Sequence, residues 1–124
     1  MENNYDLVIS IVNRGHSDPV VEASREAGAN GGTIIYGRGT GKDEVDTFMG
    51  VSIQPEKEII MTLTKSENKN NIMEAICEKA GLDAAGMGIC FSLPVTKVRG
   101  ISSKPANQNS LKQNNNLKQT ETKK

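Results

Sequence analysis

The order of its apolar segments limits the folds open to this chain more than any other feature of the sequence. Residues 5–13 alternate branched apolar side chains between two faces, which favours a central strand. Residues 17–28 place Pro19 in a first helical turn and end at a glycine, which is typical of a helix capped by Ser17 or Asp18.

The later segments extend this pattern to a complete small domain. Three more strands are predicted at 31–37, 56–64 and 89–98, and a second helix at 66–82. Ser66 or Asn68 would cap that helix and Gly81 would end it. The order strand, helix, strand, strand, helix, strand predicts an α+β, ferredoxin-like βαββαβ fold with a four-stranded antiparallel sheet.

Two helices can cover only one face of such a sheet, yet its strands look apolar on both faces. Consecutive apolar residues occur in three of the strands: Ile34 and Ile35; Ile59, Ile60 and Met61; Ile89, Cys90 and Phe91. Such runs of consecutive apolar residues are typical of strands that are buried on both faces. We therefore expect a second subunit to cover the open face, in a homo-oligomer of closed symmetry.

A long segment at about 37–55 shows no sustained period and predicts a loop of roughly 18 residues, more than compact domains tolerate without a functional reason. It opens with the glycine-rich run from Gly37 to Lys42, whose amides and cation suggest a phosphate cradle. The run is not a Walker motif, because only three residues separate Gly37 from Gly41 and Asp43 follows the lysine.

Charge divides the chain into two parts. The 124 residues hold 15 Lys and Arg against 15 Asp and Glu, with no Trp, which argues against a dedicated nucleic-acid binder. Residues 102–124 carry five Lys and one Glu among polar residues, so they are +4 while residues 1–101 are −4. We expect a folded domain at 1–101 and a disordered basic tail at 102–124.

Cysteine spacing and the lack of a long apolar run indicate a cytoplasmic protein. Cys77 and Cys90 are 13 residues apart, which fits neither a zinc site nor a disulfide framework, so both are interpreted as small core residues. No stretch approaches the ~20 apolar residues of a membrane span, and the N-terminus does not resemble a signal peptide.

Few side chains suggest catalysis or metal binding. His16 is the only histidine, and its spacing from possible nucleophiles predicts no catalytic triad. The loop carboxylates Asp43, Glu44 and Asp46 have no histidine or cysteine beside them, which favours a solvated acidic loop over a metal site. We therefore expect no catalytic residue, no metal and no cofactor.

The glycines and their order resemble those of the nitrogen regulatory P-II signalling family. The likeness runs from about Tyr5 to Ile101. It rests on three runs: Gly31, Gly32 and Thr33 entering the second strand; Gly39, Thr40, Gly41 and Lys42 opening the loop; and Gly86, Met87 and Gly88 before the last strand. The resemblance implies a non-enzymatic homotrimer whose sheets pack inward.

The resemblance also implies an effector and a partner. Such proteins bind an adenine nucleotide (ATP, ADP or AMP) between subunits, often with 2-oxoglutarate, and their long T-loop controls a membrane transporter or a metabolic enzyme in nitrogen utilisation. Thr33 would approach the adenine, and Lys42 would approach the phosphates. By position, the nucleotide-binding residues would be Thr33, Gly39, Thr40, Gly41, Lys42, Gly86, Met87, Gly88 and Arg99.

The chain departs from the family pattern at several of its cations. No lysine follows Gly88, and the two arginines expected after the last strand fall on Gly100 and Ser102, which leaves Arg99 one step out of register. Each lost charge-assisted contact would cost about 1.5 to 3 kcal/mol. The loop is about four residues short and has no tyrosine, which excludes control by tyrosine modification; Gln54 is not in register for 2-oxoglutarate.

Two alternatives remain open on the same fold. One is a small phosphatase of the acylphosphatase type, with Arg14 and Asn13 holding phosphate; the long loop and the apolar outer face count against it. The other is a trimeric metal-binding protein, which has little support because His16 and the separated cysteines form no obvious soft site.

Overall fold

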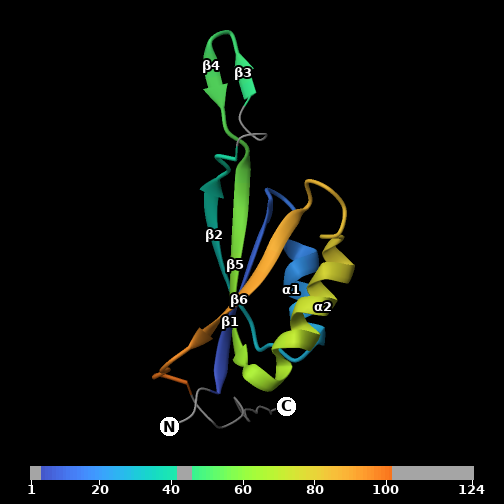
Figure 1. The fold of residues 1–124 in the computed structure, drawn as a ribbon, viewed down its shortest axis with the longest axis vertical. Helices are drawn as coiled ribbons and strands as arrows, with labels where there is room; N and C mark the ends of the chain where they lie inside the picture. Colours follow the sequence, from blue (N-terminus) through green and yellow to red (C-terminus); the bar gives the residue numbers. More distant parts are fainter. Residues whose placement is uncertain (1–3, 42–45, 102–124) are drawn as a thin grey trace, which may run out of the picture.

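Four antiparallel strands in the order β2-β5-β1-β6 form the body of the molecule (Figure 1). The structure, a computed structural model, describes residues 4–41 and 46–101. The body elements are β1 (Tyr5–Asn13), α1 (Ser17–Glu26), β2 (Thr33–Arg38), β5 (Glu56–Lys65), the 3-10 turn η1 (Ser66–Asn68), α2 (Lys69–Ala80) and β6 (Gly88–Val95). This order confirms the ferredoxin-like fold. The predicted tail at 102–124 lies outside the described residues.

The ends of the first helix differ from the expectation. His16, not Ser17 or Asp18, occupies the N-cap position of α1 and makes no side-chain capping bond. Because Ser17 is already helical, its side chain cannot serve as the cap. The helix ends at Glu26, two residues before Gly28, which has a φ of +114°.

The second helix confirms its predicted end and changes its start. Gly81 terminates α2 in the left-handed conformation, with a φ of 68°. Asn68 stands at the N-cap without a side-chain capping bond. Ser66 instead lies in η1, and its hydroxyl donates to a carboxylate oxygen of Asp6 on β1.

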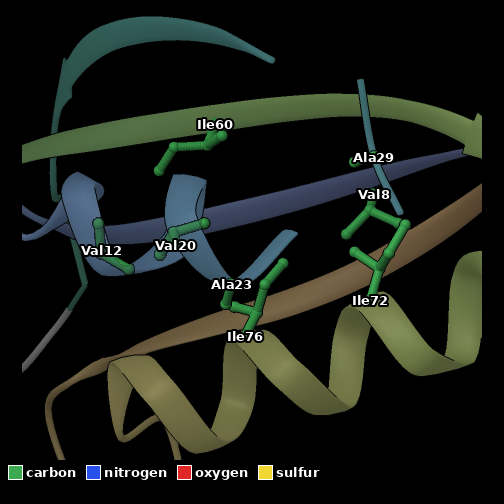
Figure 2. Packing of buried hydrophobic residues seen from close by; sticks show 8 residues of the cluster. All are labelled: Val8, Val12, Val20, Ala23, Ala29, Ile60, Ile72 and Ile76. Atoms are coloured by element: carbon green, nitrogen blue, oxygen red, sulfur yellow. The ribbon is translucent and has the colours of Figure 1, made fainter. Parts of the chain in front are cut away.

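The core lies between the helices and one face of the sheet, and Figure 2 shows side chains from both layers meeting there. Ile72 and Ile76 of α2 are fully buried, as the 3.6-residue spacing requires. The complete cluster is Val8, Val12, Val20, Ala23, Ala29, Ile60, Ile72 and Ile76.

Alternate residues of β1 face opposite environments. Val8, Ser10 and Val12 are buried beneath the helices, whereas Leu7, Ile9 and Ile11 are only partly covered. Both helices lie on the same side of the sheet (Figure 1). The described residues therefore leave the other face uncovered.

That open face is apolar, as expected. Across it run the odd-numbered residues of β1, β5 and β6 and part of β2, according to the strand register. Ile89 is 57% exposed and Phe91 37%, and Ile35, Leu63 and Leu93 are exposed as well. A contiguous apolar surface of this kind marks an interaction site in a soluble protein.

The long segment contains a hairpin, so its interpretation as a loop without strands was wrong. β3 (Asp46–Phe48) pairs with β4 (Val51–Ile53) in a two-stranded sheet. Met49 and Gly50 both have positive φ, 53° and 82°, which suits the two-residue turn of a type I′ hairpin. We call residues 46–53 the arm; it projects beyond the body along the long axis (Figure 1).

Candidate functional site

The start of the long segment and the second glycine turn lie at the same end of the sheet. Gly37 is paired with Lys57, Lys57 with Asn13, and the neighbouring Val12 with Gly88, which forms a row across all four strands. The amide of Gly39 donates to the carbonyl of Pro55 at 2.7 Å. We call this closure, where the chain leaves and rejoins the body, the neck.

Asn13 joins three elements at this end. Its side-chain amide donates to the carbonyl of Gly86 at 3.0 Å, which ties β1 to the turn before β6. Its Oδ1 accepts a hydrogen bond from Nζ of Lys57 on β5 at 2.8 Å. A lysine is thereby held beside the second glycine turn, although no lysine follows Gly88 in the sequence.

Packing explains the second glycine turn in part. Gly88 has a φ of +137°, and an added Cβ would lie 2.4 Å from the carbonyl oxygen of Ile11. Gly86 has a φ of +78° and open space around its Cα. At position 88 only glycine both adopts the positive φ and avoids the clash with Ile11, whereas at position 86 only the positive φ favours glycine.

The remaining predicted residues do not all gather here. Thr40 and Gly41 follow Gly39 at the neck and are exposed, and Lys42 lies outside the described residues. Thr33 begins β2 and lines a separate pocket of about 320 Å³. Arg99 is exposed and follows the far end of β6, whose Val95 is paired with the first residue of β1.

A pocket of about 450 Å³ at the neck was not predicted from the sequence. Its lining residues are Arg14, Tyr36, Gly37, Arg38, Glu56 and Lys57. They come from the turn after β1 and from the ends of β2 and β5 that flank the long segment. The only sequence signal was the presence of basic residues on both sides of that segment.

Carboxylates organise the turn after β1. Arg14 forms an ion pair with Glu56, which raises the pKa of the guanidinium. The Ser17 hydroxyl and the Gly15 amide lower the pKa of Glu58, and the amide donates to Oε2 at 3.2 Å. Glu58 is only 7% exposed, and its Oε1 has no hydrogen-bond partner among the described residues.

A comparison with known protein families identifies the family of this chain. The model of the nitrogen regulatory protein P-II family matches residues 5–104, most of the chain. The chain belongs to the P-II family. Members of this family are signalling regulators that form trimers and bind effectors and partner proteins.

A solved P-II protein agrees with this assignment in its fold. The chain is similar to the Arabidopsis thaliana PII protein bound to citrate, with a TM-score of 0.60 and 22% sequence identity. The match covers 81% of this chain and 82% of that protein. At this identity the likeness shows the fold alone. No curated protein matches the chain significantly.

In this P-II protein both cysteine thiols have raised pKa values. A carboxylate of Asp83 raises the pKa of the Cys77 thiol, and burial raises that of Cys90. A thiol with a raised pKa is a weak nucleophile. Among the hydrogen bonds of the described residues, the imidazole ring of His16 contacts only the carbonyl of Arg14, at 3.3 Å.

The residues of the phosphatase alternative are used in other contacts. Asn13 bridges Gly86 and Lys57, while Arg14 is paired with Glu56. Of the residues that the structure describes, no group of three His, Cys, Asp or Glu side chains could hold a metal ion. No helix in the described ranges has the length and apolar character needed to span a bilayer.

Proposed function

We propose that this P-II family chain is a cytoplasmic homotrimer that binds an adenine nucleotide between subunits. Nucleotide binding changes the state of the long segment, which controls a transporter or a metabolic enzyme of nitrogen utilisation. The observation that carries the proposal is the meeting of two glycine-rich segments, one of which opens the long segment, at one end of the sheet. Backbone amides in such segments form concavities that bind phosphate.

The uncovered sheet face supports assembly. Its central residues Ile9, Ile59 and Phe91 would lose contact with water if the sheets of three protomers packed together. Each Å² of apolar surface removed from water contributes roughly 25 cal/mol, so burial of this open face favours assembly of the protomers. In a cyclic trimer, one contact repeated between neighbouring protomers buries the open sheet face of all three.

The positions of Thr33 and Arg99 support a site between protomers. Gly39 lies six positions beyond Thr33 along an extended chain, which corresponds to about 20 Å. Arg99 lies beyond the opposite end of the sheet from Gly88. We therefore infer that one protomer supplies the glycine segments and a neighbouring protomer supplies Thr33 and Arg99 to the same nucleotide.

A ligand panel tests the nucleotide. Thermal unfolding would be followed with ATP, ADP, AMP and 2-oxoglutarate, with and without Mg²⁺, and calorimetry would follow any hit. A ligand at a hundred times its Kd stabilises the protein by about 2.7 kcal/mol per site. Citrate belongs in the panel because the similar Arabidopsis protein was solved with it. No shift with any nucleotide would refute the proposal.

A lysine variant locates the site. We expect Lys42→Ala to weaken nucleotide binding without changing the oligomer, because it removes the cation that follows the neck glycines in the sequence. Lys79→Ala is the matched control, since Lys79 lies on α2 and contacts Glu22 and Glu26. Calorimetry and light scattering give the two readouts. Equal affinity in both variants would remove Lys42 from the site.

The arm supports a role in partner control, because it presents a hairpin away from the body (Figure 1). Its replacement by a glycine-serine linker should abolish capture of a partner from membrane or soluble extracts while nucleotide binding persists. The wild-type capture should also respond to nucleotide, because control requires different binding to two states of the segment. Partner capture that is unchanged both by loss of the arm and by added nucleotide would refute the proposed role of the arm.

A further inference from the structure

A groove lies between the two helices, which pack against each other on one side of the sheet (Figure 1). Its volume is about 440 Å³, and its lining residues are Ala23, Glu26, Ala75, Glu78 and Lys79. Glu26, Glu78 and Lys79 are exposed, whereas Ala23 is buried. The groove is therefore a hollow with a small apolar floor and a charged rim, on the outer surface of the helix layer.

Each helix contributes the same pair of side chains to this groove. Glu26 follows Ala23 by three positions on α1, and Glu78 follows Ala75 by three positions on α2. Residues three apart in a helix are neighbours on one face, so each alanine has a carboxylate beside it. The groove thus offers, twice, a small apolar site next to a negative charge.

The rim of the groove retains negative charge. Lys79 lies between Glu22 and Glu26, with distances of 3.2 and 3.6 Å from its Nζ to their carboxylate oxygens. Glu78 makes no ion pair with any residue that the structure describes. The two helices together hold five carboxylates and three cations, so their formal charge is −2. This surface therefore attracts a cation supplied by another segment.

The sequence of residues 102–124 carries the complementary chemistry. Five Lys and one Glu give this segment a formal charge of +4. Its only two large apolar residues, Leu111 and Leu117, each begin the same tripeptide, Leu-Lys-Gln. Each copy places a branched apolar side chain next to a cation, which is the counterpart of an alanine next to a glutamate.

We propose that residues 102–124 of this chain dock in the groove between α1 and α2. A leucine of one Leu-Lys-Gln copy packs on the two alanines, and the lysine after it pairs with Glu26 or Glu78. Exposed ion pairs are individually weak. However, a short tether raises the effective concentration of a binding segment to about the millimolar range, and the two copies provide two equivalent segments.

The segment is long enough to reach the groove. β6 ends at Val95, which is paired with the first residue of β1. The amide of Ser66 donates to the carbonyl of Asn4 at 2.8 Å, so α2 starts near the same end of the sheet. Leu111 lies ten positions beyond the last described residue, which spans up to about 33 Å of extended chain. The 12 residues of α2 rise only about 18 Å, so a groove near the middle of α2 is within reach.

The groove does not overlap the surfaces used in the proposed function. It lies on the helix side of the sheet, whereas assembly buries the open side. The glycine segments and the arm contribute no residue to its lining. Docking in the groove is therefore compatible with a trimer and does not depend on nucleotide binding.

Carbodiimide cross-linking of the full-length protein tests this contact, because the reagent joins a lysine amine directly to a neighbouring carboxylate. At low ionic strength, mass spectrometry should find Lys112 or Lys118 joined to Glu26 or Glu78. High salt should lower the yield several-fold, since the Debye length falls from about 10 Å at 0.1 M to about 3 Å at 1 M. Unlabelled and 15N-labelled protein, mixed after purification, show whether the two peptides come from separate molecules.

Substitutions distinguish a specific contact from general attraction. Leu111→Ser combined with Leu117→Ser keeps every charge and leaves residues 1–101 intact, and it should lower the cross-link yield about fivefold or more. Glu78→Gln should lower the total yield about two- to fivefold, because it removes one carboxylate of the rim. Glu67→Gln is the matched control, since Glu67 is an exposed carboxylate of η1 outside the groove, and it should leave the yield unchanged.

Three results would overturn the proposal. The first is the absence of any cross-link from Lys112 or Lys118 to the groove. The second is a yield that the two leucine substitutions do not change, because attraction between charges alone then explains the contact. The third is cross-linking between labelled and unlabelled protein, because the groove then binds the segment of a separate molecule.

Discussion

The close approach of β6 to β1 at Gly88 allows a stability prediction of defined size. A Cβ at this position lies 2.4 Å from the carbonyl oxygen of Ile11. That oxygen belongs to a central strand bonded on both sides, so it cannot move without disturbing the sheet. Overpacking of this kind costs about 1–3 kcal/mol. The φ of +137° adds about 1–3 kcal/mol for a residue with a side chain. Gly88→Ala should therefore lower the free energy of unfolding by about 2–6 kcal/mol.

Gly86→Ala provides the matched control for this prediction. Gly86 has a φ of +78° and no atom within 4 Å of an added Cβ, so only backbone strain of about 1–2 kcal/mol applies. Urea unfolding followed by circular dichroism, at one protomer concentration for all variants, gives the difference. Equal unfolding midpoints for the two variants would show that the contact with Ile11 does not constrain position 88.

Three further substitutions test the core, the open face and the turn after β1. Ile76→Ala should destabilise the protein by about 2–5 kcal/mol in the same urea assay, because Ile76 is fully buried. Phe91→Lys should convert the oligomer to monomers in light scattering; an unchanged mass would mean that this face is not the interface. Glu58→Gln should lower stability at pH 7, because Ser17 and Gly15 favour the ionised carboxylate in the folded state. Because the pKa of this carboxyl is lower in the folded state than the unfolded value of about 4.3, its ionisation stabilises the folded protein above that value. This stabilisation is lost as the pH falls through the folded pKa. The difference from wild type should therefore shrink below about pH 4, and a gap that stays constant with pH would contradict the assignment.

The fold was predictable because its signals are local. The alternation at Val8 and Val12 and the helical spacing of Ile72 and Ile76 each reflect one element packing on one core. The hairpin was missed because three-residue strands are too short to show a period. The type I′ turn at Met49 also places a positive φ on a residue that rarely signals one.

The site was predictable only where glycine marks it. Gly39 and Gly86 stand out in the sequence because glycine frees the backbone, and the structure brings their segments to one end of the sheet. The bridge from Lys57 through Asn13 depends on strand register, which joins residues 44 apart in the chain. The neck pocket likewise combines side chains from three segments, so no single stretch of sequence could reveal it.

Side chains along β1 alternate between the two faces of the sheet, so neighbouring positions are under different selective pressures. Val8 and Val12 must fit two helices of their own chain, so they can change only together with residues of that chain. Leu7, Ile9 and Ile11 face away from those helices. A gene duplication could therefore give two copies that keep the same fold while the odd positions of this strand diverge, until each copy recognises only its own kind.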